Sequence, residues 1–192
     1  MKVVSVFGSP HKKGNTATVL GWVEEELVNQ GHDVDRINVT EYKVNGCLGC
    51  YTCQKKPDEP GCPQKDDAVE ILNRMIDADA IIYASPMFCW SWTGQIKPLI
   101  DRHFCLVTDA GTPKWKSLIT GKPTALVMTS AGPVKGNADM LIKQFDSLAG
   151  FAKASVVDRL AVPLCTTPDA IPDNVKQQAA KLAGDLANHG QG

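Results

Sequence analysis

The sequence predicts an α/β protein in which a five-stranded parallel sheet, of strand order 2-1-3-4-5, is covered by helices on both faces. Short runs of β-branched and aliphatic residues alternate along the chain with segments whose apolar residues have helical spacing. Such alternation implies right-handed crossover connections, which place helices on both faces of a parallel sheet. Five strands connected in this way fit the doubly wound order, and a ligand is then expected outside the carboxyl ends of the strands.

Three apolar runs predict the central strands, because a parallel strand covered on both faces is apolar throughout. They span residues 3–7, 80–84 and 124–128. Residues 33–39 and 155–162 carry more charge or alternation, which is typical of strands nearer the edge of a sheet.

Five segments between these strands have the apolar spacing of amphipathic helices. In the first, one apolar stripe runs from Val19 to Leu27, and Gly31 follows the end of the segment. The predicted helices span residues 16–30, 68–76, 94–104, 137–148 and 174–188.

Length and composition limit the class of protein. The chain has 192 residues, 43% hydrophobic and 21% charged, and no stretch has the composition of a linker between domains. We therefore expect one domain over residues 1–192. A net charge of −1 offers no basic surface for nucleic acid. The first residues are too soon interrupted for a signal peptide, and no apolar run is long enough to span a membrane, so we expect no membrane partner and a cytoplasmic location.

The loop after the first strand has the composition of a phosphate site. It spans residues 8–16, GSPHKKGNT, and runs directly from strand to helix. Its hydroxyls, amide side chain and backbone N–H groups would converge at the positive end of that helix, where a dianionic phosphate is bound. The spacing is neither that of a P-loop nor that of the dinucleotide-binding G-x-G-x-x-G motif. A plain strand-to-helix turn capped by Asn15 or Thr16 is the alternative, but it does not need so many polar residues. The candidate phosphate ligands are Ser9, His11, Lys13, Gly14, Asn15 and Thr16.

This loop resembles the phosphate loop of the NADPH-dependent FMN reductase group in the flavodoxin-like superfamily. Members of that group carry G-S-x-R-x-x-[SG]-[NY]-T or close variants. His11 stands where Arg is commonest, which keeps a hydrogen-bond donor but makes its charge depend on pH near neutrality. The resemblance implies a flavodoxin-like three-layer sandwich that binds the phosphate of FMN at residues 8–16.

An apolar and aromatic loop, PMFCWSW at residues 86–92, follows the third predicted strand. Pro86 removes a donor and stiffens the chain, and an exposed apolar loop is costly unless something planar covers it. A flavin ring is such a partner. Packing of Phe88, Trp90 and Trp92 against a neighbouring subunit is the alternative, and both contacts can coexist.

The stretch at residues 85–102, SPMFCWSWTGQIKPLIDR, resembles the flavin loop and following helix of the same family. The family pattern is S-P-x-Y before G-x-[LI]-K-x-x-[LIF]-D-R, so Phe88 replaces the usual Tyr and one hydroxyl is lost. Asp101 and Arg102 are consecutive on the predicted helix and point in different directions, which favours ion pairs at the helix end or an interface over a catalytic role. The candidate ring contacts are Pro86, Met87, Phe88, Cys89 and Trp90.

The loop after the fourth predicted strand, TSAGPVKGN at residues 129–137, consists largely of small residues. Small side chains let backbone amides approach the edge of a ring, and in the family this loop covers the pyrimidine side of the flavin. A strand-to-helix turn capped by Asn137 is the alternative. The candidate contacts are Ser130 and Gly132.

A cysteine-rich insertion at residues 42–65 is the second specific signal. Its spacing, C-x2-C-x2-C-x8-C, allows three thiolates to surround one face of an iron–sulfur cubane, with a fourth from further along. Cysteines in the cytoplasm seldom form structural disulfides, which favours metal, cluster or redox sites. The candidate ligands of a [4Fe-4S] cluster are Cys47, Cys50, Cys53 and Cys62.

This insertion resembles the compact cysteine motif of the iron–sulfur flavoproteins, which share the fold and have an acidic pair like Asp66-Asp67 after the motif. The gap before Cys62 is longer here than in that family. Zinc bound by four thiolates and reduced structural cysteines are the alternatives. Cys105 and Cys165 stand alone in the sequence and are expected in the core.

The resemblances imply an FMN-dependent oxidoreductase. A hydride from NAD(P)H would reach the flavin, which would pass electrons to a quinone, a second flavin or another small acceptor. The alternative is an electron carrier in which FMN and a [4Fe-4S] cluster exchange electrons with a redox protein such as ferredoxin. A homodimer or homotetramer is expected from the family and the aromatic loop, and no catalytic residue is assigned.

Overall fold

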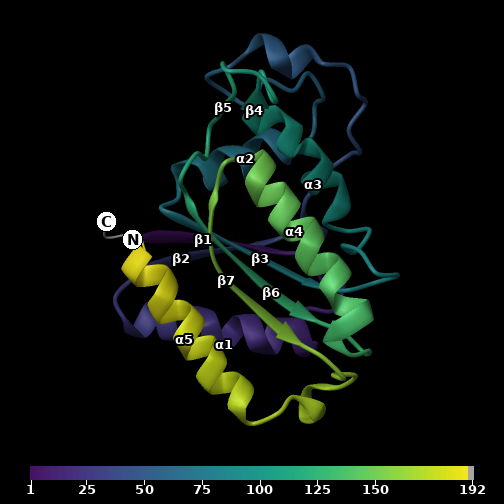
Figure 1. The fold of residues 1–192 in the computed structure, drawn as a ribbon, viewed down its shortest axis with the longest axis vertical. Coiled ribbons are helices and arrows are strands. Elements are labelled where there is room, and N and C mark those ends of the chain that lie inside the picture. Colours follow the sequence, from purple (N-terminus) through teal and green to yellow (C-terminus); the bar gives the residue numbers. More distant parts are fainter. Residues whose placement is uncertain (190–192) are drawn as a thin grey trace.

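The computed structural model describes residues 1–189, and five parallel strands form its main sheet in the order β2-β1-β3-β6-β7 (Figure 1). In chain order these are the five predicted strands, so the predicted 2-1-3-4-5 arrangement is confirmed. The strands are β1 (Lys2–Phe7), β2 (Asp33–Asn38), β3 (Ala80–Pro86), β6 (Pro123–Thr129) and β7 (Ser155–Val162).

Helices cover both faces of this sheet (Figure 1). Helices α1 and α5 pack side by side over one face, and their apolar residues share one core with it. Helices α2, α3 and α4 contribute to the core on the other face. The bounds are α1 (Asn15–Asn29), α2 (Ala68–Asp77), α3 (Lys97–Arg102), α4 (Asp139–Phe151) and α5 (Asn174–His189).

Strand β1 shows why the central strands are apolar throughout. Val4 and Val6 lie in the core beneath α2 and α4, whereas Val3 and Phe7 lie in the core beneath α1 and α5. Successive side chains point to opposite faces, so a strand covered on both sides needs apolar residues on both of them. Ser5, which is buried and polar, donates its hydroxyl to Glu24. The predicted edge strands, β2 and β7, do lie at the edges and are less buried.

The parallel register brings the carboxyl ends of the strands level with one another. Phe7 pairs with Ala84 across β1 and β3, and Pro86 pairs with Thr129 across β3 and β6. The loops that follow these strands therefore leave the sheet from one edge.

Two predictions about local structure need correction. The helix expected at residues 94–104 is the shorter α3, followed by a 3₁₀ turn, His103–Leu106. Pro98 lies in the first turn of α3, where its missing N–H leaves no intrahelical bond unmade, and this favours a helix start at Lys97. The connection at residues 107–122 contains a small antiparallel pair, β4 (Val107–Thr108) and β5 (Lys116–Ser117), and strands of two residues have no periodicity to detect.

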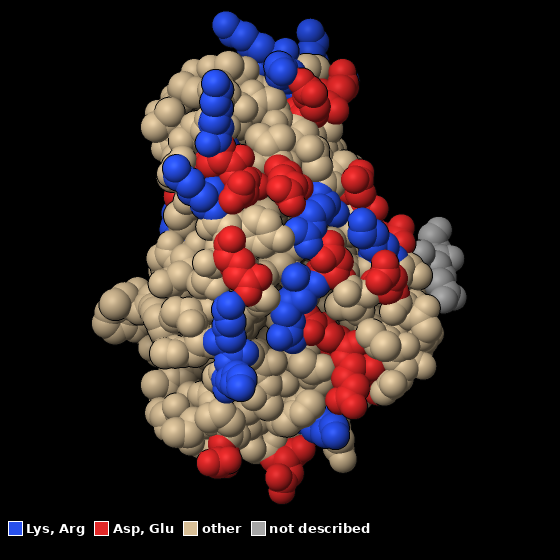
Figure 2. All heavy atoms as spheres, turned by 180° about the vertical axis from the view of Figure 1, so that it is seen from behind, with Lys and Arg blue, Asp and Glu red and all other residues tan. Residues whose placement is uncertain are grey.

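Charged side chains of both signs are interleaved over the face seen in Figure 2. Charged side chains also form ion pairs, such as Arg74 with Asp35 and Arg159 with Asp146. Within residues 1–189, no helix combines the length and apolar character needed to cross a bilayer.

The core beside α3 contains a buried polar pair. The Tyr83 hydroxyl lies 2.9 Å from His103 Nε2, and His103 Nδ1 lies 2.9 Å from the carbonyl oxygen of Leu99. Because Nδ1 donates to a carbonyl, Nε2 of the neutral ring accepts from the Tyr83 hydroxyl. Burial lowers the pKa of His103 to about 4 and raises the pKa of Tyr83.

We expect His103 to make stability fall in mild acid. In the unfolded chain the His103 imidazole binds a proton below its ordinary pKa of about 6.5, whereas in the folded protein it does so only near pH 4. The free energy of unfolding should therefore fall by about 2–3 kcal/mol as the pH is lowered from 7 to 4.5. The His103→Gln variant should lose correspondingly less stability over this interval, as measured by denaturant unfolding at both pH values. His189→Gln, at an exposed position, is the control, and equal pH dependence in both variants would contradict the assignment.

Candidate functional site

The loops after β1, β3, β6 and β7 surround one cavity of about 480 Å3 at the carboxyl edge of the sheet. This is the edge at which doubly wound folds bind their ligands. Of the residues predicted to contact the flavin, the cavity is lined by Ser9, His11, Gly14, Asn15, Thr16, Pro86, Met87, Phe88 and Ser130.

The start of α1 opens into this cavity without a side-chain cap. Gly14 occupies the cap position and no side chain makes a capping hydrogen bond, so the alternative of a turn capped by Asn15 or Thr16 is wrong. The Thr16 hydroxyl instead bonds to the Thr129 hydroxyl at 2.7 Å, which ties the first loop to the end of β6. An uncapped helix start directs free N–H groups and a partial positive charge at whatever fills the cavity.

The two lysines of the first loop do not line the cavity. Lys12 pairs with Glu41 at 2.6 Å on the surface, and Lys13 lines an adjoining hollow that shares His11 and Gly14 with the cavity. Among the described residues, no Lys or Arg lines the cavity. His11 and Asn15 are the lining residues whose side chains carry nitrogen donors. An anion bound here would depend mainly on neutral donors.

The first and third loops are packed directly against each other. The Thr93 hydroxyl, in the loop after β3, donates to the Gly8 carbonyl in the first loop. Met87 N–H donates to the Thr129 carbonyl at 2.9 Å, which ties the loop after β3 to the end of β6. A Cβ on Gly8 would lie 2.6 Å from Ile96 Cβ, so only glycine allows this approach. The position of the first loop is therefore set by the loop after β3.

A strained two-residue turn forms the tip of the aromatic loop. Phe88 and Ser91 exchange both backbone hydrogen bonds at 3.1 Å, and between them Cys89 and Trp90 have positive φ values of 47° and 60°. Such turns favour Asn-Gly, and a left-handed non-glycine residue costs about 1–2 kcal/mol. Gln144 of α4 holds the turn, since its amide donates to the Trp90 carbonyl at 3.1 Å.

The aromatic side chains of this loop have different environments. Phe88 and Trp90 are 45% and 56% exposed, so they stand at the rim of the cavity. Trp92 is buried and packs against Tyr83, with ring centroids 6.3 Å apart. The expectation that Trp92 covers a flavin or a neighbouring subunit is therefore wrong, because its ring fills the core.

Four of the residues predicted to contact the flavin do not line the cavity itself: Lys13, Cys89, Trp90 and Gly132.

Sequence reasoning missed the wall of the cavity that follows β7. Cys165 is buried, as predicted, yet it also lines the cavity, and burial raises the pKa of its thiol. The predicted strand order placed the end of β7 at the same edge, and that was the available signal. The lining residues not predicted are Thr129, Ala131, Cys165, Thr166, Thr167 and Pro168.

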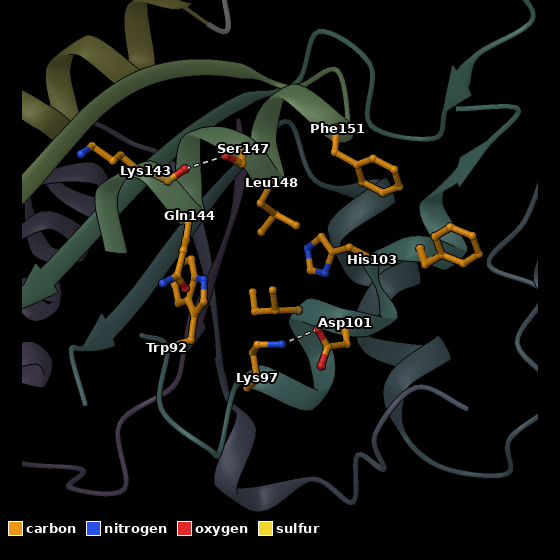
Figure 3. Close-up of a pocket in the computed structure, with 11 residues that line it drawn as sticks. Trp92, Lys97, Asp101, His103, Lys143, Gln144, Ser147, Leu148 and Phe151 are labelled. Carbon is orange, nitrogen blue, oxygen red and sulfur yellow. Dashed lines mark hydrogen bonds and ion pairs between the residues drawn. The ribbon is translucent and has the colours of Figure 1, made fainter. Parts of the chain in front are cut away.

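A second groove, of about 520 Å3, runs between α3 and α4 (Figure 3). Its charged side chains are engaged: Asp101 pairs with Lys97, and Lys143 lies 3.7 Å from Asp139. His103 lines it as a neutral ring bonded to Tyr83. The groove thus lacks the free polar groups that the first cavity concentrates.

The four clustered cysteines do not converge in this structure. Cys47 and Cys50 are exposed, whereas Cys53 is buried with its sulfur 4.0 Å from the Phe104 carbonyl oxygen. Within residues 1–189, no three His, Cys, Asp or Glu side chains surround a position that could hold a metal ion. As placed here, the thiols do not surround a [4Fe-4S] cluster or a zinc ion, and ligation by Cys47, Cys50, Cys53 and Cys62 stays a prediction.

A buried ion pair attaches the cysteine segment to α3. Arg102 and Asp66 have fully buried side chains and lie 2.8 Å apart, and Arg102 also donates to the Asn45 carbonyl. Burial raises the pKa of Asp66, but hydrogen bonds from Arg102 and from the N–H groups of Asn45 and Ala68 outweigh it, so the net pKa is lowered. Since Asp101 pairs with Lys97 on the surface, the prediction that these neighbours point in different directions is confirmed.

We expect Asp66→Asn to destabilise the protein by about 3–5 kcal/mol, because it leaves the buried Arg102 charge uncompensated. Asp101→Asn, which breaks the exposed pair with Lys97 on α3, should lower the free energy of unfolding by less than about 1 kcal/mol. The measurement is the free energy of unfolding in urea at pH 7. Equal costs for the two variants would contradict the burial of the Arg102–Asp66 pair.

Residues 1–169 match the model of the NADPH-dependent FMN reductase family. The chain belongs to this family. The matched residues include all four loops around the cavity, so the NADPH-dependent FMN reductase family shares the segments from which the site is built.

Several relatives carry a more specific name. An iron–sulfur flavoprotein of Archaeoglobus fulgidus is 39% identical over 102 residues, which are 53% of this chain and 45% of that protein. One from Methanosarcina thermophila is 32% identical over 106 residues, 55% of this chain and 54% of that protein. The chain spans about half the length of these relatives. A candidate NAD(P)H-dependent FMN-containing oxidoreductase of Bacillus subtilis is 24% identical over 151 residues, 79% of this chain and 78% of the relative.

Solved structures of low sequence identity share the fold. An FMN-dependent NADH-azoreductase from Bacillus anthracis, in complex with FMN, superposes with a TM-score of 0.72 at 14% identity over 98% of this chain and 100% of the azoreductase. An NAD(P)H:quinone oxidoreductase from Methanothermobacter marburgensis superposes with a TM-score of 0.70 at 17% identity, over 98% of this chain and 96% of the oxidoreductase. The flavodoxin-like fold is thereby confirmed.

Proposed function

We propose that this protein binds FMN in the cavity at the carboxyl edge of the sheet and acts as an NAD(P)H-dependent reductase of a quinone, a flavin or another small acceptor. The observation that carries the proposal is the uncapped start of α1, which opens into the cavity opposite the apolar loop after β3. A ligand with a phosphate at one end and an apolar ring at the other fits both. Family membership supports the same conclusion.

The phosphate end of the site would be the loop at residues 8–16. The backbone N–H groups at the start of α1 and the side chains of Ser9 and His11 are placed to donate hydrogen bonds. Asn15 lines the cavity, but its amide donates to the Cys165 carbonyl. Lys13 lies outside the cavity lining, so its charge would attract the phosphate without a direct contact. Thr16 would act through Thr129, to which its hydroxyl is bonded.

The ring end would be formed by the loops after β3 and β6. Pro86, Met87 and Phe88 offer an apolar surface for one face of the ring, and Ser130 approaches its edge. Gly132 lies outside the cavity lining and would act through Ser130. The Ser130 hydroxyl donates to the Gly132 carbonyl at 2.9 Å within this loop, and Ser130 N–H donates to the Val162 carbonyl at 3.0 Å, which ties the loop to β7. When bound, FMN supplies the redox chemistry, taking a hydride from NAD(P)H and passing electrons to the acceptor.

Phe88, Cys89 and Trp90 would form the rim over which the nicotinamide or the acceptor lies. Their exposed apolar area is also suited to a neighbouring subunit, which supports a homodimer or homotetramer. We further propose a single flavin-binding domain over residues 1–192, with residues 42–65 as an insertion, and a cytoplasmic location.

An electron carrier with FMN and a [4Fe-4S] cluster is the second candidate. It is favoured by the iron–sulfur flavoprotein name of several relatives. The divergent thiols do not support it, and no step of the proposed reaction passes through a cluster.

Anaerobically purified protein supplied with FMN should show the absorption bands of oxidised flavin. NADPH or NADH should bleach these bands, and a quinone should restore them. Bleaching by reduced ferredoxin but by neither nicotinamide would favour the electron carrier, and a broad absorption to the red of the flavin bands would report a cluster. Failure to bind added FMN would contradict both functions.

The position of the first loop should control FMN affinity. Gly8→Ala forces a methyl group against Ile96, and such overpacking costs about 1–3 kcal/mol, so FMN binding should weaken about tenfold. Gly150→Ala, on α4 with open space around the new methyl group, is the matched control. Flavin fluorescence quenching measures both dissociation constants, and equal values would show that the contact between the two loops does not shape the site.

A further inference from the structure

The loop between β7 and α5 is fixed against the FMN cavity by three hydrogen bonds. Cys165 N–H donates to the Ser130 carbonyl at 3.0 Å, and Leu164 N–H donates to the Gly132 carbonyl at 3.3 Å. The Asn15 side-chain amide donates to the Cys165 carbonyl at 2.8 Å. The loop is therefore tied both to the loop after β6 and to the start of α1.

The bond from Asn15 places this loop at the phosphate end of the cavity. Asn15 is the first residue of α1, the helix whose N-terminus faces the proposed phosphate. Residues 166–167 follow the anchored Cys165 directly and line the same cavity. The ring end is formed by Met87 and Phe88 with the loop after β6, to which Leu164 and Cys165 N–H are bonded. The bond from Asn15 comes next along the chain, at the Cys165 carbonyl, so residues 166–167 continue on the phosphate side.

The charge of the cavity makes additional neutral donors necessary. A phosphate monoester carries close to two negative charges at pH 7, yet none of the described residues that line the cavity is Lys or Arg. Thr166 and Thr167 are exposed toward solvent, and neither hydroxyl is hydrogen-bonded to another described residue. Both hydroxyls are thus available to a ligand.

We propose that Thr166 and Thr167 donate hydrogen bonds to the phosphate of FMN, and that Asn15 is the positioning residue that holds their loop in place. The inference rests on the proposed FMN site and extends it by a fourth loop. It makes the β7–α5 loop a determinant of selectivity for the phosphorylated flavin over riboflavin. The remaining carbonyl oxygen of the Asn15 amide is buried without a partner, so the amide is oriented by its one bond to Cys165.

The test compares FMN with riboflavin, which lacks the phosphate. In the double variant Thr166→Val/Thr167→Val, FMN affinity should fall about a hundredfold, because each of the two hydrogen bonds to a charged group contributes about tenfold or more. Riboflavin affinity should change less than about twofold. The control is Thr120→Val. Thr120 is exposed and precedes β6, at the amino ends of the strands and away from the cavity. Fluorescence quenching by the full-length chain gives each dissociation constant.

The role of Asn15 is tested by combining variants. Asn15→Ala should weaken FMN binding selectively, and adding it to the threonine double variant should cause little further loss, because residues that act through one another are not additive. Fully additive losses would show that Asn15 contacts the phosphate independently and would overturn its positioning role.

The outcomes separate this inference from the proposed function. Wild-type protein that binds neither flavin would contradict the FMN site itself. Wild-type protein that binds FMN, together with a threonine variant of unchanged FMN affinity, would overturn the inference alone. An equal loss for FMN and riboflavin would also overturn it, since the hydroxyls would then act elsewhere than at the phosphate.

Discussion

All five strands of the main sheet run in the same direction, and this constraint places the functional loops. Because the strands are parallel, each chain reversal needs a helix, and each loop that leaves a carboxyl end meets the others at one edge. The apolar cores on the two faces support this edge, since Met87 and Cys165 pack with them and also line the cavity. Residues separated by some 150 positions, such as Asn15 and Cys165, can then share a hydrogen bond.

The sequence allowed much of this to be predicted, for a physical reason. Buried parallel strands must be apolar throughout, so runs such as residues 80–84 are recognisable without any contact information. The start of α1 was recognisable because Gly14 and the polar residues around it are unusual between a strand and a helix. Three of the four cavity loops follow from these two signals and from the family resemblance.

What the sequence did not reveal depends on tertiary contacts. The burial of Trp92 depends on its packing against Tyr83, and no local pattern distinguishes it from the exposed Trp90. Thr166 and Thr167 sit in a stretch with the composition of an ordinary turn. The divergence of the four cysteines likewise depends on how residues 42–65 fold back on α3, where the Arg102–Asp66 pair holds the segment.

The turn at Cys89 and Trp90 has an energetic consequence for how this protein could change over time. Two left-handed residues without glycine are a standing conformational cost of about 2–4 kcal/mol, and an Asn-Gly pair would form the same reversal more cheaply. Selection for stability alone would replace both residues. The Cys89 thiol and the Trp90 indole are therefore held at the rim although their backbone conformation is unfavourable. Substitutions at these two positions that stabilise the fold would also change the surface offered to a ligand.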